Sequence, residues 1–228
     1  MATATKTNPA AAKAAPAAAA ETLTPTRAYL TATLDEDSGE VIETPMFRYL
    51  PGHPRQVRFD AKAGQFNVGG ITPLGPKLAF IPVALRIFED DILNMGRKTW
   101  AELFFVDAGG AVCAVLFHGY SVENLQKLNA ELFYDDLRLV DVVLTVKATK
   151  KENKKVGGTY YIAEFEYVPA AEAEVAARQQ FAEDFPLFRE ETLTGTADLR
   201  IVQGYRLPEG REPQPQPAQL AAAEVVSQ

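Results

Sequence analysis

A short basic and aromatic segment contains the residue types that most directly suggest chemistry. The segment 147-KATKKENKKVGGTYY-161 places five lysines just before two adjacent tyrosines. Ammonium groups neutralise phosphates and release counterions, and flat rings stack on unpaired bases at about 1–3 kcal/mol per base. The candidate contacts to a single-stranded nucleic acid are therefore Lys147, Lys150, Lys151, Lys154, Lys155, Tyr160 and Tyr161. The same composition is also typical of a solvated hairpin tip, and the sequence does not choose between these interpretations.

A second basic and aromatic cluster lies upstream, where residues 45–88 carry six Lys or Arg against one acid, Asp60. Within it Arg48, Arg55 and Arg58 are interspersed with Phe47, Tyr49 and Phe59. Alternation along the following strands places Arg86 on one face with Phe80 and Phe88, and Trp100 on one face with Phe104. The candidate contacts from this region are Arg48, Arg55, Arg58, Arg86 and Trp100. Periodicity does not show whether Trp100 faces the core or the solvent.

Groups that could support catalysis are few. Cys113 and His118 lie five residues apart on a predicted strand, and an odd separation places them on opposite faces. Paired carboxylates such as Asp90-Asp91 and Asp135-Asp136 lie where strands and helices are expected to end, which is typical of solvated turns. No phosphate-binding glycine loop or nucleophile elbow is present, and one cysteine with two histidines cannot supply a zinc site of the usual spacing. We expect neither catalysis nor a cofactor or metal.

Composition predicts one folded domain with polar ends. The chain has 228 residues, is 47% hydrophobic and carries a net charge of −7, and its longest apolar stretches are shorter than the roughly 18 residues of a membrane helix. Residues 1–26 are Ala/Thr/Pro-rich and 206–228 are Pro/Gln/Ala-rich, so we expect both to be disordered around a domain at 27–205. A single cysteine forms no internal disulfide, which favours a reducing compartment.

Apolar alternation predicts a mainly β domain with one central helix. The expected strands are 78–88, 99–107, 111–119, 139–149 and 159–168. Asp107-Ala108-Gly109-Gly110 predicts a hairpin between the second and third strands. After Gly119, Ser121 is a candidate N-cap for a helix carrying Leu125, Leu128 and Leu132. An added hairpin is expected upstream with arms at 56–61 and 65–70, and downstream a helix at 170–185 and a last strand at 197–205.

The order of three strands, a helix and two strands resembles the OB-fold, a small, partly open five-stranded Greek-key barrel. In such a barrel the loop between the fourth and fifth strands overhangs the ligand groove, and here that loop is the lysine-rich segment. The resemblance predicts a barrel spanning about 76–168, with the N-terminal hairpin and the C-terminal helix as extensions.

The chain also resembles the single-stranded DNA-binding proteins encoded by phages and mobile elements. The residues that carry the resemblance are 98-KTWAELFFVDAGGAVCAVLFHGYSVENL-125 and 141-DVVLTVKATKKENKKVGGTYYIAEFEYV-168. It implies non-enzymatic coating of single strands in replication or recombination, in the cytoplasm of a bacterial or phage-infected cell, with replication or recombination proteins as partners. The C-terminus AAAEVVSQ departs from the acidic, hydrophobic-tipped tail typical of bacterial relatives, which puts partner recruitment through it in doubt.

Two other function classes remain open from the sequence. One is a structural or adaptor β-domain, such as a virion or assembly component, whose basic loop contacts a protein. The weakest is an enzyme of nucleic-acid metabolism without recognisable motifs. The preference between DNA and RNA, the site size and self-association, including a homo-oligomer, are left open as well, because they depend on groove geometry and exposed strand edges.

Overall fold

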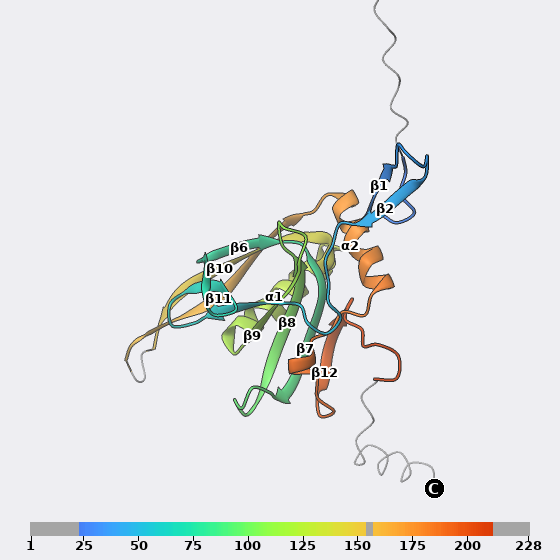
Figure 1. Cartoon of the computed structure of the whole chain (residues 1–228). Coiled ribbons are helices and arrows are strands. Elements are labelled where there is room, and N and C mark those ends of the chain that lie inside the picture. The colour runs from blue at the N-terminus through green and yellow to red at the C-terminus, as the bar shows by residue number, and fades with distance from the viewer. Residues whose placement is uncertain (1–22, 154–156, 212–228) are drawn as a thin grey trace, which may run out of the picture.

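The structure is a computed structural model that describes residues 23–153 and 157–211. It is mainly β with two α-helices (Figure 1). The strands are β1 Leu30–Leu34, β2 Val41–Pro45, β3 Arg55–Asp60, β4 Gln65–Val68, β5 Thr72–Gly75, β6 Lys77–Phe80, β7 Pro82–Asp91, β8 Arg97–Val106, β9 Val112–His118, β10 Val142–Glu152, β11 Thr159–Pro169 and β12 Asp198–Gln203. The helices are α1 Tyr120–Tyr134 and α2 Glu172–Asp184, with 3₁₀ turns at Leu139–Asp141 and Glu190–Thr192.

The strands form three open sheets. A seven-stranded sheet has the order β12-β7-β8-β9-β3-β4-β5, a three-stranded sheet has the order β11-β10-β6, and β1 pairs with β2. The strand expected at 78–88 is interrupted at Ile81, so β6 pairs with β10 in one sheet while β7 pairs with β8 in the other. The prediction of a mainly β fold is confirmed, but the sheets are open and do not close into a barrel, because no ladder joins β9 to β11 in the described chain.

Contacts from α1 and from the turn of the β3–β4 hairpin bridge the gap between β9 and β11. The Ser121 hydroxyl accepts a hydrogen bond from the Ala163 backbone N–H at 3.0 Å, and the Asn124 amide donates to the Ala163 carbonyl at 2.9 Å. The Tyr161 N–H donates to the Ala61 carbonyl at 2.8 Å. These contacts satisfy backbone groups on the free edge of β11, which would otherwise be open to another strand.

Several elements expected from the sequence are present. The helix between the third and fourth expected strands is confirmed, and Leu125, Leu128 and Leu132 are its buried stripe. Its N-cap is Gly119, so the assignment of Ser121 as the cap is wrong. The 107–110 hairpin is confirmed by the Gly110 N–H donating to the Asp107 carbonyl at 2.9 Å.

Gly110 also fixes how the N-terminal segment joins the sheet. It has φ +79°, and a Cβ there would lie 2.6 Å from the Met46 carbonyl oxygen. The Gly110 carbonyl in turn accepts from the Arg48 N–H at 2.7 Å. Only glycine allows both the left-handed backbone and this close approach.

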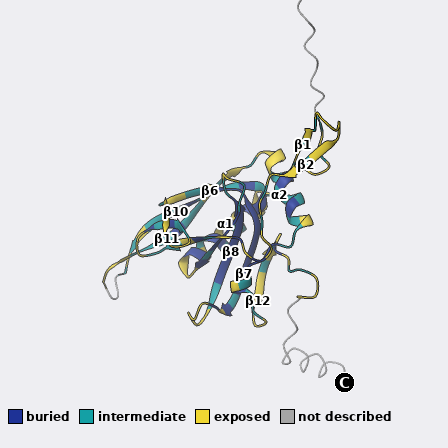
Figure 2. Cartoon of the chain, viewed as in Figure 1, coloured by how far each residue is buried: buried dark blue, intermediate teal, exposed yellow. Residues whose placement is uncertain are grey.

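Residues 177–207 cover one face of β7, β8 and β9. The helix α2 and the segment after it pack Phe181, Leu187 and Phe188 against Ala84, Phe104 and Ala114. The central strands are buried on both faces, whereas the β1–β2 hairpin is largely exposed (Figure 2). A second apolar layer therefore lies on the sheet face that points away from α1.

A buried ion pair ties this covering segment to the sheet. Arg86 on β7 and Glu102 on β8 are 1% and 0% exposed, and Arg86 Nε donates to a Glu102 carboxylate oxygen at 2.8 Å. Arg86 Nη2 also donates to the Thr192 carbonyl at 3.0 Å and to its hydroxyl oxygen at 2.6 Å. The guanidinium lies between the rings of Phe88 and Tyr205, at 4.1 and 4.6 Å from their centroids. Thr194 and Thr196, two and four residues after Thr192, donate to the buried Asp90 carboxylate.

Replacing Arg86 with methionine is expected to lower the free energy of unfolding by about 3–5 kcal/mol, because the buried Glu102 carboxylate would lose its partner at 2.8 Å and keep only the Arg189 guanidinium at 3.8 Å. Urea unfolding followed by the fluorescence of Trp100, the single tryptophan, measures this change. The control is Lys147→Ala, which removes an exposed pair and should cost less than about 1 kcal/mol. Equal, small effects of both substitutions would contradict the role given to the buried pair.

Candidate nucleic-acid interface

The β10–β11 hairpin brings the predicted lysines and tyrosines together. Its register places Lys150 opposite Tyr161 and Lys151 opposite Tyr160, and residues directly opposite in an antiparallel pair share a face. The hairpin extends away from the rest of the fold (Figure 1). Lys154 and Lys155, also candidate contacts, lie outside the described residues.

Acidic neighbours neutralise part of this basic surface. Lys147 Nζ lies 2.5 Å from a Glu166 carboxylate oxygen, and Lys151 Nζ lies 2.9 Å from one of Glu164. Hydrogen bonds from Lys151 and Thr149 hold the pKa of Glu164 below its usual value, so this carboxylate stays charged. Lys150 is exposed and forms no ion pair with any described residue, and it is the lysine best placed to meet an incoming phosphate.

A cavity of about 240 Å³ opens where the hairpin meets the body of the protein. We call it the tyrosine slot. Its lining residues come from β3, β9, α1 and β11 and include Phe59, Phe117, His118, Tyr120, Tyr160 and Tyr161. The ring of Tyr161 packs over Gly64, where a Cβ would lie 2.5 Å from it. Tyr120 is 59% exposed at the entrance to α1.

Sequence reasoning missed two residues of this slot, His118 and Tyr120. Burial lowers the pKa of His118, and nearby Lys98 lowers it further, so the imidazole is neutral near pH 7. Tyr120 follows Gly119 directly, and the only available signal was an aromatic residue at the point where the strand pattern stops. Both residues line the slot because α1 approaches β11. The alternation of residues within one strand does not predict this approach.

The upstream arginines do not continue the hairpin surface. Arg55 lies beside the start of β9, where its guanidinium pairs with Asp107 at 2.9 Å. Arg58 lies on the opposite face of β3, near the amide oxygen of Gln56. Arg48 donates to the Gly109 carbonyl at 2.6 Å, at the β8–β9 turn. Arg48, Arg55 and Arg58 therefore contact other elements than the hairpin lysines do.

Arg86 and Trp100 are both buried. The expected outward, basic and aromatic face of β7 is wrong, because Arg86 is held by Glu102 and Thr192 beneath the C-terminal segment. Trp100 is 1% exposed, and its indole N–H donates to the Asp90 carbonyl at 3.1 Å. In this conformation neither side chain can reach a ligand at the surface.

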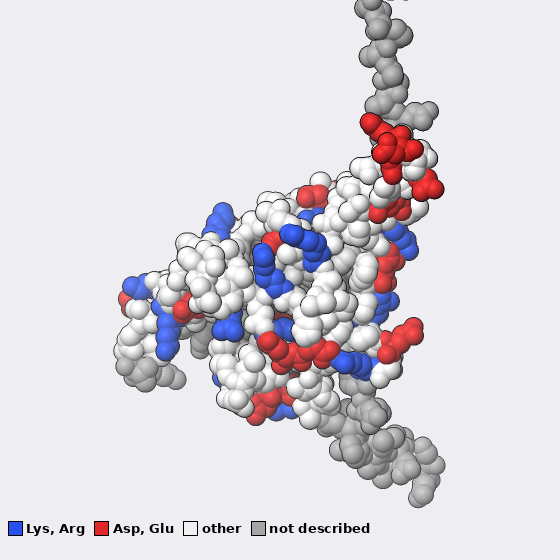
Figure 3. All heavy atoms as spheres, viewed as in Figure 1, with Lys and Arg blue, Asp and Glu red and all other residues white. Residues whose placement is uncertain are grey.

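Basic and acidic side chains are interspersed over the face shown in Figure 3, where red and white atoms separate the blue ones. The acids of the β1–β2 hairpin gather at one end of this view, far from the β10–β11 hairpin. Because positive and negative side chains are mixed on this face, any attraction of a phosphate to it comes from individual lysines or arginines and not from a broad positive potential.

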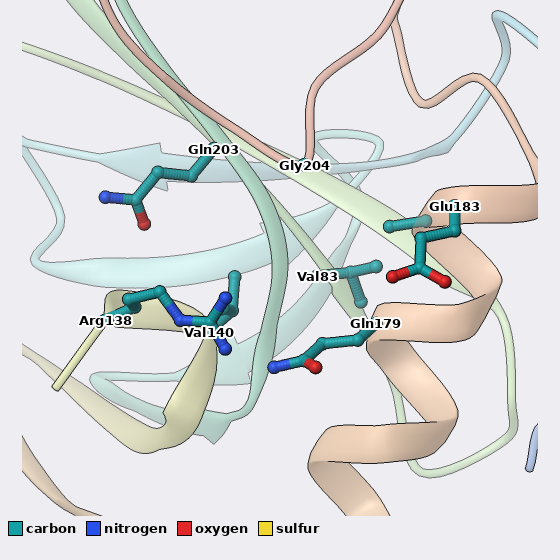
Figure 4. A pocket seen from close by; sticks show the side chains of 8 residues that line it. Val83, Arg138, Val140, Gln179, Glu183, Gln203 and Gly204 are labelled. Atoms are coloured by element: carbon teal, nitrogen blue, oxygen red, sulfur yellow. The ribbon is translucent and has the colours of Figure 1, made fainter.

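A second cavity, of about 290 Å³, lies between α2, β7 and β12. Figure 4 shows its Arg138 and Gln179 side chains pointing toward one another. Both donate to the Asp141 carboxylate, Arg138 through two nitrogens at 2.8 and 2.9 Å and Gln179 at 3.1 Å. Because these polar groups satisfy each other, the arrangement is that of a structural contact between α2 and the turn before β10.

Cys113 and His118 lie on opposite faces of β9, as expected. The thiol is buried in the main core and donates to Asp107, while the imidazole lies edge-on to Trp100 with ring centroids 5.3 Å apart. Residues 23–153 and 157–211 contain no group of three or more His, Cys, Asp or Glu that could hold a metal ion. None of the described helices is long and apolar enough to span a bilayer.

Comparisons of the chain with protein-family models, with curated proteins and with solved structures gave no match. The candidate interface therefore stands on its own residues and geometry.

Burial and the neighbouring Asp107 carboxylate raise the pKa of the Cys113 thiol to about 12. We expect iodoacetamide at pH 8 to alkylate Cys113 at least 100-fold more slowly in the folded protein than in urea, because the thiolate is the reacting form. The pKa of this thiol is near 9 in the unfolded chain and about 12 in the folded protein. Its contribution to the free energy of unfolding should therefore decrease as the pH rises from about 9 toward 12. Mass spectrometry of quenched samples measures the rate, and equal rates would contradict the assigned environment.

Proposed function

We propose that this protein binds single-stranded DNA without catalysis, through the β10–β11 hairpin and the tyrosine slot at its base. The bound strand would lie along the hairpin, with phosphates near Lys150 and Lys151 and bases near Tyr160 and Tyr161. The roles proposed are coating of single strands in replication or recombination, with partners among the proteins of those processes.

The observation that carries the proposal is the pairing of basic and aromatic residues at one place. Lys150 lies opposite Tyr161 on one face of the hairpin and Lys151 opposite Tyr160 on the other, and both tyrosines line a cavity with further aromatic walls. Half-buried rings next to lysines, one of which has no ion pair among the described residues, suit a flexible polyanion with stackable bases. A solvated hairpin tip needs neither the cavity nor the adjacent aromatic residues.

The arrangement of strands supports the proposal at the level of fold. Read through the interrupted strand β6/β7, the order is β11-β10-β6/β7-β8-β9, with α1 between β9 and β10. We propose that residues 77–169 form an open variant of the OB-like arrangement. In that arrangement the β10–β11 hairpin corresponds to the loop that overhangs the ligand groove.

The proposed interface differs from the sequence-based one in position. The face of β7, β8 and β9 is covered by α2 and the segment after it, so a strand cannot lie across those strands. The open end between β9 and β11 remains accessible beside the hairpin. Of the twelve candidate residues, those retained are Lys147, Lys150, Lys151, Lys154, Lys155, Tyr160 and Tyr161.

Removing the loop lysines should weaken binding and flatten its salt dependence. The variant replaces Lys150, Lys151, Lys154 and Lys155 with alanine, and fluorescence anisotropy with labelled oligo-dT is measured from about 50 to 200 mM salt. Each lost phosphate contact should reduce the slope of log K against log salt by about 0.7, the value for single strands. A control variant removes four exposed arginines elsewhere, Arg27, Arg97, Arg200 and Arg211. Equal slopes for the two variants would remove the hairpin from the interface.

Replacing Tyr160 with leucine should reduce oligo-dT affinity by roughly 5- to 150-fold while leaving the salt slope unchanged, because one stacked base contributes about 1–3 kcal/mol and no charge is lost. Tyr134→Leu is the matched control, since this ring is 84% exposed on α1 and outside the slot. A Tyr160 variant that binds as tightly as the Tyr134 variant would refute a stacking role.

A protein-binding adaptor is the second candidate function. It is favoured by the edge-to-face pair Phe133 and Tyr134 on α1, which are 74% and 84% exposed. Exposed aromatic side chains of this size are enriched at protein interfaces. A folded protein that ignores oligo-dT at 50 mM salt would favour this function over the first.

A further inference from the structure

A third cavity, of about 370 Å³, lies between β5, β6 and the start of β9. Its walls are mostly apolar and include Val57, Val68, Leu74, Leu78, Phe80 and Phe105. Phe80 and Phe105 stack with ring centroids 4.0 Å apart and form a flat inner wall. The volume is within the range of roughly 300–1,000 Å³ that small-molecule sites occupy.

The polar groups of this cavity are gathered beside the β8–β9 turn. The Asp107 carboxylate is already saturated, because one oxygen accepts from the N–H groups of Gly109 and Ala111 and the other from Arg55 and the Cys113 thiol. It therefore has no remaining oxygen lone pair well placed for a ligand. It fixes the position of Arg55, whose side chain is 54% exposed.

Arg55 keeps donors that no described residue engages. Its Nη1 bonds to Asp107, while its Nε and Nη2 have no acceptor in residues 23–153 and 157–211. A second guanidinium, that of Arg48, is held nearby by the Gly109 carbonyl. Because two arginines and one carboxylate, Asp107, lie at this end of the apolar cavity, their summed charge is positive.

We propose that this cavity binds a small amphiphile with an aliphatic body and a carboxylate head. The head pairs with the free edge of the Arg55 guanidinium, because the planar fork of arginine matches a carboxylate. The aliphatic body lies against Leu74, Leu78 and Phe80, where its apolar surface is removed from water. The proposal does not rest on nucleic-acid binding, since it uses the other end of β3 and none of the hairpin lysines.

Calorimetric titration with decanoate below its micellar concentration tests the proposal on the full chain. We expect saturable binding of one decanoate per protein and at least tenfold weaker binding of decyltrimethylammonium, which has the same tail and the opposite charge. Arg55→Gln should weaken decanoate binding at least tenfold. Arg58→Gln, on the other face of the same strand, is the matched control and should leave it unchanged.

A second variant keeps the test independent of the Arg55–Asp107 pair. Leu74 is 41% exposed on the short strand β5, so Leu74→Asp should fold and should abolish decanoate binding by placing a negative charge in the wall. The same variant should bind oligo-dT as the unmodified protein does. Absence of saturable decanoate binding, equal binding of the two amphiphiles, or equal effects of Arg55→Gln and Arg58→Gln would overturn the proposal, whatever the outcome with oligo-dT.

Discussion

The buried contact between Arg86 and Glu102 is the interaction on which the rest of the structure depends. Two charges at 1% and 0% exposure are tolerated when they pair with each other and gain further hydrogen bonds. Arg86 Nη2 also donates to Thr192, which lies more than a hundred residues away in sequence. The sheet and the C-terminal segment therefore specify each other's position, because displacing the segment would remove Thr192 from both the Arg86 guanidinium and the Glu102 carboxylate.

This constraint determines which surfaces remain available for binding. Residues after α2 cover the face of β7, β8 and β9, and Thr194 and Thr196 fasten the same segment to Asp90. The aromatic and basic groups of that face become core. The candidate binding surfaces lie instead at the open end of the sheets, with the hairpin and the tyrosine slot, and at the cavity beside Arg55.

The open end has its own physical cause. A closed barrel would pair β9 with β11, but β9 pairs in parallel with β3, and β11 receives hydrogen bonds from Ser121, Asn124 and Ala61 instead. Two side chains of α1 and the turn at Ala61 thus form hydrogen bonds with backbone groups of β11 that would otherwise pair with another strand. A cavity remains between them because a helix and a turn do not fill that space as continuously as a strand would.

The sequence by itself determined the elements and the local pairing. Alternation found β8, β9, β10 and β11, glycine and aspartate at 107–110 found the hairpin, and leucine spacing found α1, because these signals act between residues close in the chain. It did not find β1, β2 or β5, and it predicted β6 and β7 as one strand. It also placed the hairpin lysines next to Tyr160 and Tyr161, since one turn sets that register.

Only the tertiary structure decided which face of each strand is covered. The same alternation in β7 is compatible with Arg86 at the surface or in the core, and the outcome depends on a threonine far along the chain. Closure of the sheet likewise depends on contacts between distant segments. A pattern of period two records that two faces differ, but it carries no information about what packs against either of them.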